Sequence, residues 1–162
     1  MIKKLALLLL LVVLFTSSGQ TYEQQSLIPF LEKWLPGKPL ESLLSKLQIP
    51  YWGITVSIEE RGYYYFIEFL LRKSAHFFIF GFLALAIYSV LPKHTFRIYT
   101  AAIITLFIAF GDEFHQSLTG GRTPSFQDVI LDTAGAVTAL ILLHFVLIYI
   151  NRRNQKNPLR DK

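Results

Sequence analysis

The chain has 162 residues, of which 52% are apolar and only 17% are charged, and this composition excludes an ordinary soluble domain and favours a membrane protein. The net charge of +5 comes mainly from basic residues beside apolar runs, which indicates membrane topology and argues against nucleic acid as a partner. The chain has no cysteine, so disulfides, thiolate nucleophiles and zinc–thiolate sites are excluded.

The first apolar run covers residues 5–15 and follows Lys3 and Lys4. It is shorter than the roughly 20 residues of a normal span, so both a cleaved signal peptide and a short first helix fit it. The small-residue pattern of a cleavage site is missing, which favours a retained helix or signal-anchor over about 5–18. In either case the two lysines are expected in the cytoplasm.

Residues 20–71 are interrupted by prolines and are expected to form an ordered extracellular segment that covers the helices. Leucines recur within it at helical spacing, opposite polar residues, which predicts a short amphipathic helix on the membrane surface: Leu40, Leu43, Leu44 and Leu47. An aromatic cluster at 63–69 marks the return of the chain to the headgroup region.

Three further spans are predicted at about 74–91, 98–118 and 129–150, joined by short connections. The first connection and the tail at 151–162 are basic, so both are expected in the cytoplasm. The sequence therefore predicts an all-α integral membrane bundle of about four transmembrane helices. It would form one domain over 1–162, multi-pass in the cell membrane, with both termini cytoplasmic.

Ionisable residues gather near the predicted outer ends of the last three spans. Each charge at the bilayer centre costs on the order of 2.5–3.5 kcal/mol on insertion scales, so such a collection at one depth predicts an outer-leaflet site. The candidate catalytic residues are His76, Asp112, Glu113, His115, Asp128 and Asp132. The candidate ligand-binding residues are Arg72, Lys73, Gln116 and Arg122.

Several chemistries fit this set of side chains. His76 or His115 can act as an acid or base, and the carboxylates can orient the histidine or hold a divalent cation. Arg122 lies in a glycine-rich turn and suits bidentate binding of a phosphate or carboxylate. The structural alternatives are a buried pair of Arg122 with Asp128 or Asp132, and a helix-to-helix hydrogen bond from His76. Neither a metal nor a cofactor is determined by the sequence.

Three short motifs resemble those of the VanZ-like family of bacterial membrane proteins: Arg72-Lys73-x-x-His76-Phe77, Asp112-Glu113-x-x-Gln116, and Gly121-Arg122-x5-Asp128-x3-Asp132-x-x-Gly135. The resemblance runs from about residue 68 to 145. It implies the multi-span architecture and a context in the cell envelope, because the family is named for a protein linked to low-level resistance to the glycopeptide teicoplanin. Many members carry Asn where this chain has Asp132.

Two functional hypotheses follow, and the sequence does not decide whether the protein is an enzyme. In the first, the site binds or modifies an anionic, lipid-linked or lipidated ligand in the outer leaflet and contributes to glycopeptide resistance. In the second, the protein is a non-catalytic assembly or interaction factor whose polar cluster stabilises the bundle. Membrane lipids are expected partners in both, and four short spans also allow a homodimer. A channel is least favoured, because no polar stripe continues toward the cytoplasm.

Overall fold

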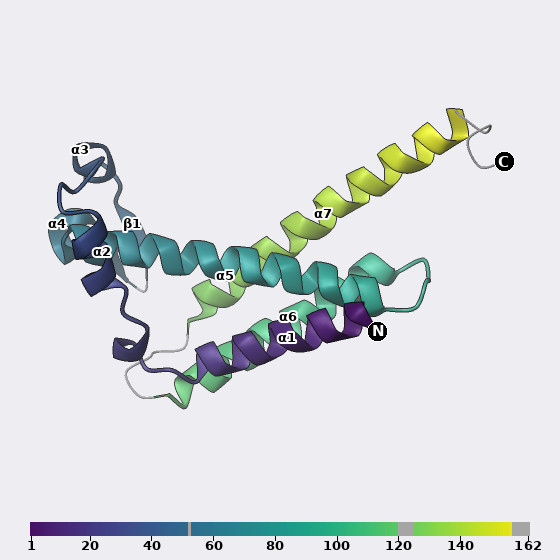
Figure 1. Cartoon of the computed structure of the whole chain (residues 1–162), viewed down its shortest axis with the longest axis horizontal. Coiled ribbons are helices and arrows are strands. Elements are labelled where there is room, and N and C mark those ends of the chain that lie inside the picture. Colours follow the sequence, from purple (N-terminus) through teal and green to yellow (C-terminus); the bar gives the residue numbers. More distant parts are fainter. Residues whose placement is uncertain (52, 120–124, 157–162) are drawn as a thin grey trace.

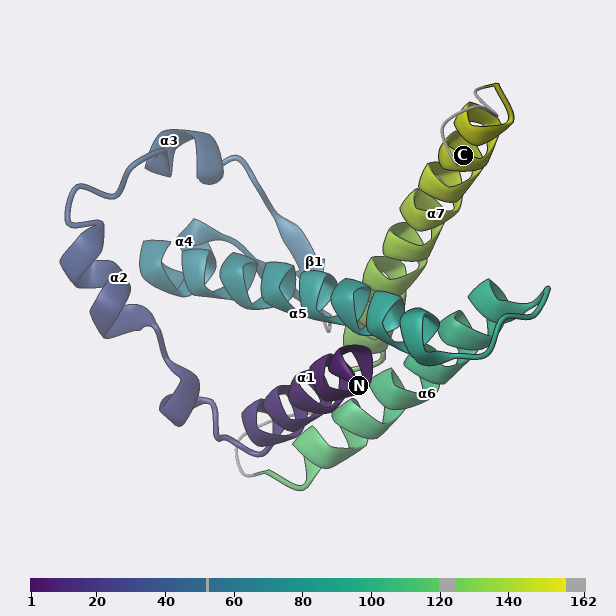
Figure 2. The same ribbon diagram turned by 45° about the vertical axis from the view of Figure 1, so that its right-hand side comes forward.

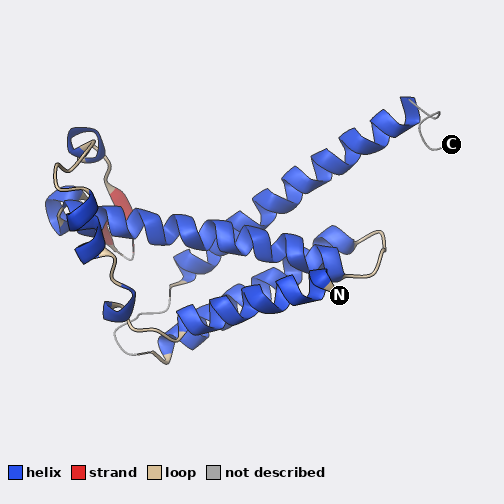
Figure 3. Cartoon of the chain, viewed as in Figure 1, coloured by secondary structure: helices blue, strands red, loops and turns tan. Residues whose placement is uncertain are grey.

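The computed structural model of the chain describes residues 1–51, 53–119 and 125–156, and these are mostly helical (Figures 1 and 3). Its elements follow in this order: α1 (Ile2–Ser18), the 3₁₀ turn η1 (Glu23–Gln25), α2 (Ile28–Trp34), α3 (Glu41–Leu44), β1 (Ile49–Tyr51), β2 (Ile54–Val56), α4 (Ile58–Arg61), α5 (Tyr63–Val90), α6 (Arg97–Ser117) and α7 (Phe126–Lys156). The helical class predicted from the sequence is confirmed for the described residues.

In the described part of the chain, α5, α6 and α7 are long and apolar enough to cross a membrane. The shorter α1 has 17 residues and lies alongside α6, where it also contacts α5 (Figure 2). At 1.5 Å per residue it is about 26 Å long, slightly less than the ~30 Å hydrocarbon core of a bilayer. A fourth span by α1 therefore stays an expectation.

Helix α5 begins at Tyr63, eleven residues before the expected start at residue 74. Gly62 has a φ of +84° and forms the boundary with the preceding helix α4. The aromatic cluster is thus the first turns of α5, where Tyr63 and Phe66 are buried. Tyr63 donates a hydrogen bond to the Pro39 carbonyl (2.8 Å), so these rings hold the 20–62 segment against α5.

The 20–62 segment contains more structure than the sequence indicated. Only one helical turn, α3, forms where an amphipathic helix was expected over the four leucines. Leu40 has a left-handed φ of +60° and lies before this turn, which ends at Leu44. The antiparallel hairpin β1–β2 was not predicted, and Ile49 pairs with Val56 in it. Gly53, with a φ of +71°, permits the tight turn between the two strands.

The bundle core lies where α5 crosses α7, and apolar side chains of α1 and α6 complete it. A Cβ atom on Gly135 would lie 2.1 Å from the Phe77 carbonyl oxygen, so the two backbones are in direct contact there. Gly135 is thus a close-packing position. Gly111 is not, because nothing lies within 4 Å of its Cβ position.

The two ends of the bundle differ in their charged residues. The N-terminus, the turn between α5 and α6 and the C-terminal end of α7 lie toward one side in Figure 1, and the 20–62 segment lies at the other. The basic residues used to predict topology belong to the first of these ends: Lys3, Lys4, Lys93, Arg152 and Arg153. The ionisable candidates gather toward the opposite end.

Candidate functional site

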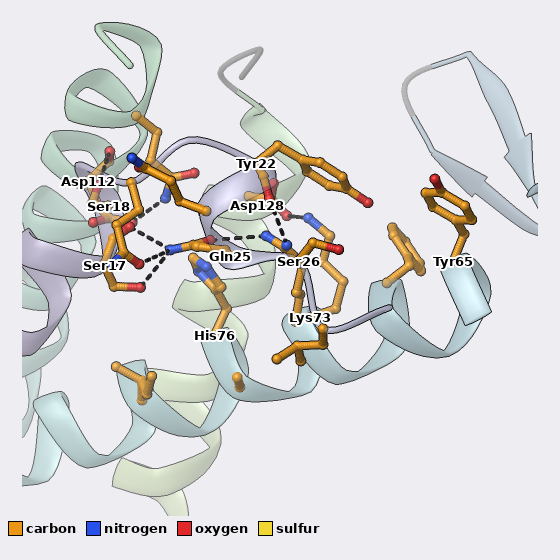
Figure 4. Close-up of a pocket in the computed structure, with 18 of the residues that line it drawn as sticks. Ser17, Ser18, Tyr22, Gln25, Ser26, Tyr65, Lys73, His76, Asp112 and Asp128 are labelled. Atoms are coloured by element: carbon orange, nitrogen blue, oxygen red, sulfur yellow. Dashed lines mark hydrogen bonds and ion pairs between the residues drawn. The ribbon is translucent and has the colours of Figure 1, made fainter. Parts of the chain in front are cut away.

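A pocket of about 770 Å³ opens between the helices at the end covered by the 20–62 segment. Side chains of α1, α5, α6 and α7 line it together with residues 20–27 and the hairpin. In Figure 4, Lys73 and His76 extend from α5 into this space, and Asp112 and Asp128 approach it from α6 and α7. The pocket therefore brings residues from all four long helices to one place.

Three helices each contribute one side chain to a cluster beside the pocket, and two of these side chains, His76 and Asp112, line the pocket itself. His76 of α5, Asp112 of α6 and Asp132 of α7 place one potential ligand atom each within 4.8 Å of one another. The His76 Nδ1 atom lies 3.3 Å from Asp132 Oδ1, and Asp132 is completely buried. Gln116 donates a hydrogen bond from Nε2 to Asp112 Oδ2 (2.6 Å), which orients that carboxylate.

Lys73 and Asp128 form an ion pair across the α5–α7 contact. The Tyr51 hydroxyl joins the pair, since it accepts a hydrogen bond from Lys73 Nζ (2.6 Å) and donates one to Asp128 Oδ2 (2.6 Å). Burial, reinforced by the bond to Asp128, raises the pKa of Tyr51, so its hydroxyl stays protonated. The sequence offered no signal for Tyr51, because its contact depends on the unpredicted hairpin.

The change Tyr51→Phe is expected to destabilise the protein by about 2 kcal/mol, since hydrogen bonds to charged groups contribute about 1.5–3 kcal/mol each. The raised pKa also sets a pH effect. As pH rises through about 10, Tyr51 loses its proton in the unfolded chain before it does so in the folded protein, so the free energy of unfolding of the wild type falls. Tyr51→Phe has no hydroxyl to ionise and lacks this fall in stability at alkaline pH.

Thermal unfolding in detergent at neutral and alkaline pH checks the Tyr51 prediction. Tyr99→Phe is the matched control, because Tyr99 is exposed on α6 far along the chain from the pair. Equal stability of Tyr51→Phe and Tyr99→Phe at every pH would mean that the Lys73–Asp128 pair does not depend on the hydroxyl.

Arg72 is held by a second ion pair, with the fully buried Glu68 (3.0 Å). Glu68 also accepts hydrogen bonds from the Leu27 backbone N–H (2.6 Å) and the Tyr22 hydroxyl (3.0 Å). Arg72 in turn donates to Gln25 Oε1 (3.0 Å). Glu68 was not predicted from the sequence, although its position four residues before Arg72 on a helix is the spacing of an ion pair.

The remaining predicted site residues, Glu113, His115 and Arg122, are not part of the cluster of His76, Asp112 and Asp132. Glu113 is buried and accepts a hydrogen bond from the Ser125 N–H (2.6 Å), just before α7 begins. His115 stacks on Phe15 of α1 with the ring centroids 4.3 Å apart, so it joins two helices away from the three-helix cluster. Arg122 lies outside the described residues.

The charges around the pocket are unevenly paired. Its described basic lining residues are Arg61, Arg72 and Lys73. Four carboxylates lie on its walls or directly behind them: Glu68, Asp112, Asp128 and Asp132. Arg72 and Lys73 are each paired with an acid. Among the described residues, Asp132 has only His76 as a basic neighbour at salt-bridge distance, and Asp112 has none.

The long apolar helices place the chain in the class of helical membrane proteins, and its charged pocket lies at one end of the bundle. The family model described as VanZ/LLP1 matches residues 4–148, and the chain therefore belongs to this family. This confirms the resemblance seen in the three motifs. Neither the curated proteins nor the solved structures include a match to this chain.

Proposed function

We propose that the pocket binds the anionic headgroup of a lipid-linked ligand at the outer leaflet of the cell membrane. The observation that supports this most directly is the composition of the pocket wall, where Arg72 and Lys73 lie beside apolar side chains of α1 and α5. Such a wall suits a ligand with a charged head and an apolar chain. Its ~770 Å³ volume lies within the usual range of about 300–1,000 Å³ for small-molecule sites.

The orientation in this proposal follows from the basic residues at the other end of the bundle. Lysines and arginines flanking spans stay preferentially in the cytoplasm. That rule puts both termini inside and the pocket outside, with α1 as a fourth span. Exposed apolar side chains on α7, such as Phe145 and Tyr149, would then contact membrane lipids or a second copy of the chain.

Both cations retain donors for a ligand, although each is paired within the protein. An ammonium group has three N–H donors, and Asp128 and Tyr51 take two of those on Lys73. The buried Nε of Arg72 has no hydrogen-bond partner in the described structure. A phosphate oxygen can accept from the third donor of Lys73, whereas the buried Arg72 Nε atom would have to move to reach a ligand.

Binding of a polyprenyl phosphate to the purified protein in detergent tests this proposal. The double change Lys73→Gln/Asp128→Asn removes both charges of the pair, so it leaves no buried charge unpaired. We expect it to weaken binding about tenfold, the effect of losing about 1.4 kcal/mol from one charge-assisted contact. Native mass spectrometry gives the bound fraction.

The control is Arg153→Gln, which removes an exposed positive charge on α7 near the C-terminus and should leave binding unchanged. Phosphatidylcholine and inorganic phosphate test whether both the anionic head and the lipid chain are needed. Equal binding of polyprenyl phosphate and phosphatidylcholine by the wild type would reject a headgroup site.

A non-catalytic role is the second candidate, and the internal ion pairs favour it. Arg72–Glu68 and Lys73–Asp128 join elements of the bundle whether or not a ligand binds. Teicoplanin susceptibility of a Gram-positive host expressing wild type or Asp112→Asn separates the two, with membrane levels matched by immunoblot. Lost protection at normal accumulation favours a site, whereas lost accumulation favours a structural cluster.

A further inference from the structure

We infer that His76, Asp112 and Asp132 form a binding site for one divalent transition-metal ion, Zn²⁺ or Mn²⁺, at the part of the pocket wall that contains His76 and Asp112. The three residues come from α5, α6 and α7, and their potential ligand atoms lie within 4.8 Å of one another. This site is separate from the headgroup proposal, because it can bind metal whether or not a lipid occupies the pocket.

The burial of Asp132 carries this inference. Its relative exposure is 0%, and neither carboxylate oxygen has a hydrogen-bond partner in the described structure. His76 Nδ1 also has no hydrogen bond, although it lies 3.3 Å from Asp132 Oδ1. Buried polar atoms are normally hydrogen-bonded, and buried carboxylates are normally paired or bound to metal. Metal coordination would satisfy these atoms together.

The charge balance of the pocket points the same way. Arg72 and Lys73 pair with their own acids, and the third basic lining residue, Arg61, has no described ion pair with Asp112 or Asp132, so these two carboxylates lie beside one histidine. Two carboxylates and a neutral imidazole carry a charge of −2, which a divalent cation balances.

The donor set also indicates the class of ion. One imidazole nitrogen with carboxylate oxygens suits Zn²⁺ or Mn²⁺, whereas Mg²⁺ and Ca²⁺ prefer oxygen ligands alone. Three protein ligands leave a position open toward the pocket. Gln116 would support the site without binding the metal, because its hydrogen bond to Asp112 Oδ2 fixes the orientation of that carboxylate.

The spacing requires only a small adjustment. Ligand atoms lie about 2.0–2.2 Å from a bound zinc ion, so two ligands of one ion are about 3–4.4 Å apart. The His76–Asp132 separation of 3.3 Å already falls in this range. The 4.8 Å limit on the other separations lies only slightly above this range.

The test measures metal in the full-length protein purified in detergent and stripped with a chelator. Equilibrium dialysis against ZnCl₂, MnCl₂ or MgCl₂, followed by elemental analysis, gives the bound metal per chain. We expect one Zn²⁺ or Mn²⁺ per chain and little Mg²⁺. His76→Gln and Asp132→Asn should each weaken binding by about 100-fold or more, since loss of a supporting residue alone costs about 10–100-fold.

Matched controls replace a histidine and an acid outside the cluster. His144→Gln alters an exposed residue of α7, and Glu59→Gln alters an exposed residue of α4, so both should bind metal like wild type. If Asp132→Asn does not accumulate, Asp112→Asn gives the same comparison at a residue that lines the pocket. Metal should also raise the unfolding temperature of the wild type and not that of the ligand variants.

Two results would overturn the inference: a wild-type protein that binds neither Zn²⁺ nor Mn²⁺, or ligand variants that bind metal as tightly as wild type. Failure of the headgroup proposal is distinguishable from both. A protein that binds metal and does not bind polyprenyl phosphate supports this site and rejects the proposed ligand.

Discussion

Replacing Gly135 with alanine is expected to prevent normal folding, because the new methyl group would lie 2.1 Å from the Phe77 carbonyl oxygen. The nearest atoms belong to the backbone of α5, so no side-chain rotation can relieve the clash. Overpacking of a core usually costs about 1–3 kcal/mol, and this contact should cost at least about 3 kcal/mol. Thermal unfolding in detergent and the amount of protein in the membrane measure the effect.

Gly111→Ala is the control for this prediction. Gly111 also lies within a helix, but nothing is within 4 Å of its Cβ position. Alanine is about 1 kcal/mol better than glycine in a helix interior, so this variant should be as stable as wild type or slightly more stable. If Gly135→Ala behaves like Gly111→Ala, α5 and α7 are not in backbone contact.

The second large effect is expected for Glu68→Ala. This change leaves Arg72 without its acid and removes the acceptor for the Leu27 N–H and the Tyr22 hydroxyl. Breaking a buried ion pair by removing one partner costs about 3–5 kcal/mol. The 20–27 segment should also separate from α5, so faster proteolysis of this segment should accompany the lower unfolding temperature.

Two comparisons separate the buried pair from a general effect of charge. Glu41→Ala breaks an exposed pair with Lys38 (3.6 Å), so its effect should be within about 0.5 kcal/mol. The double variant Glu68→Ala/Arg72→Ala leaves no unpaired charge and should recover part of the stability lost in Glu68→Ala. A double variant less stable than Glu68→Ala would contradict this account.

The helices whose structure is decided by local composition were predicted accurately from the sequence. Long apolar runs are sufficient to predict a helix that can cross a bilayer, which is why α6 and α7 were found close to their observed positions. The prediction was less accurate for α5, since the aromatic and charged residues from Tyr63 to Lys73 resemble a membrane-surface segment when read alone. The hairpin was missed because its two strands have only three residues each.

For the candidate site, most of the residues could be identified from the sequence, but the contacts between them could not. Depth along the predicted helices was enough to group His76, Asp112 and Asp132, which the structure brings together. The same reasoning also included His115, which stacks on Phe15 instead. Spacing along a single helix cannot distinguish these cases, because Asp112 and His115 are three residues apart and therefore lie close together on the surface of α6.

The sequence by itself determined the membrane class of this protein, its helical content and its family, because hydropathy and short motifs are properties of neighbouring residues. Only the tertiary structure decided that Lys73 pairs with Asp128 and that Arg72 pairs with Glu68, leaving Asp112 and Asp132 beside His76. Which charges meet depends on the rotation and crossing of the helices. In this bundle the close approach of α5 and α7 at Gly135 sets that geometry.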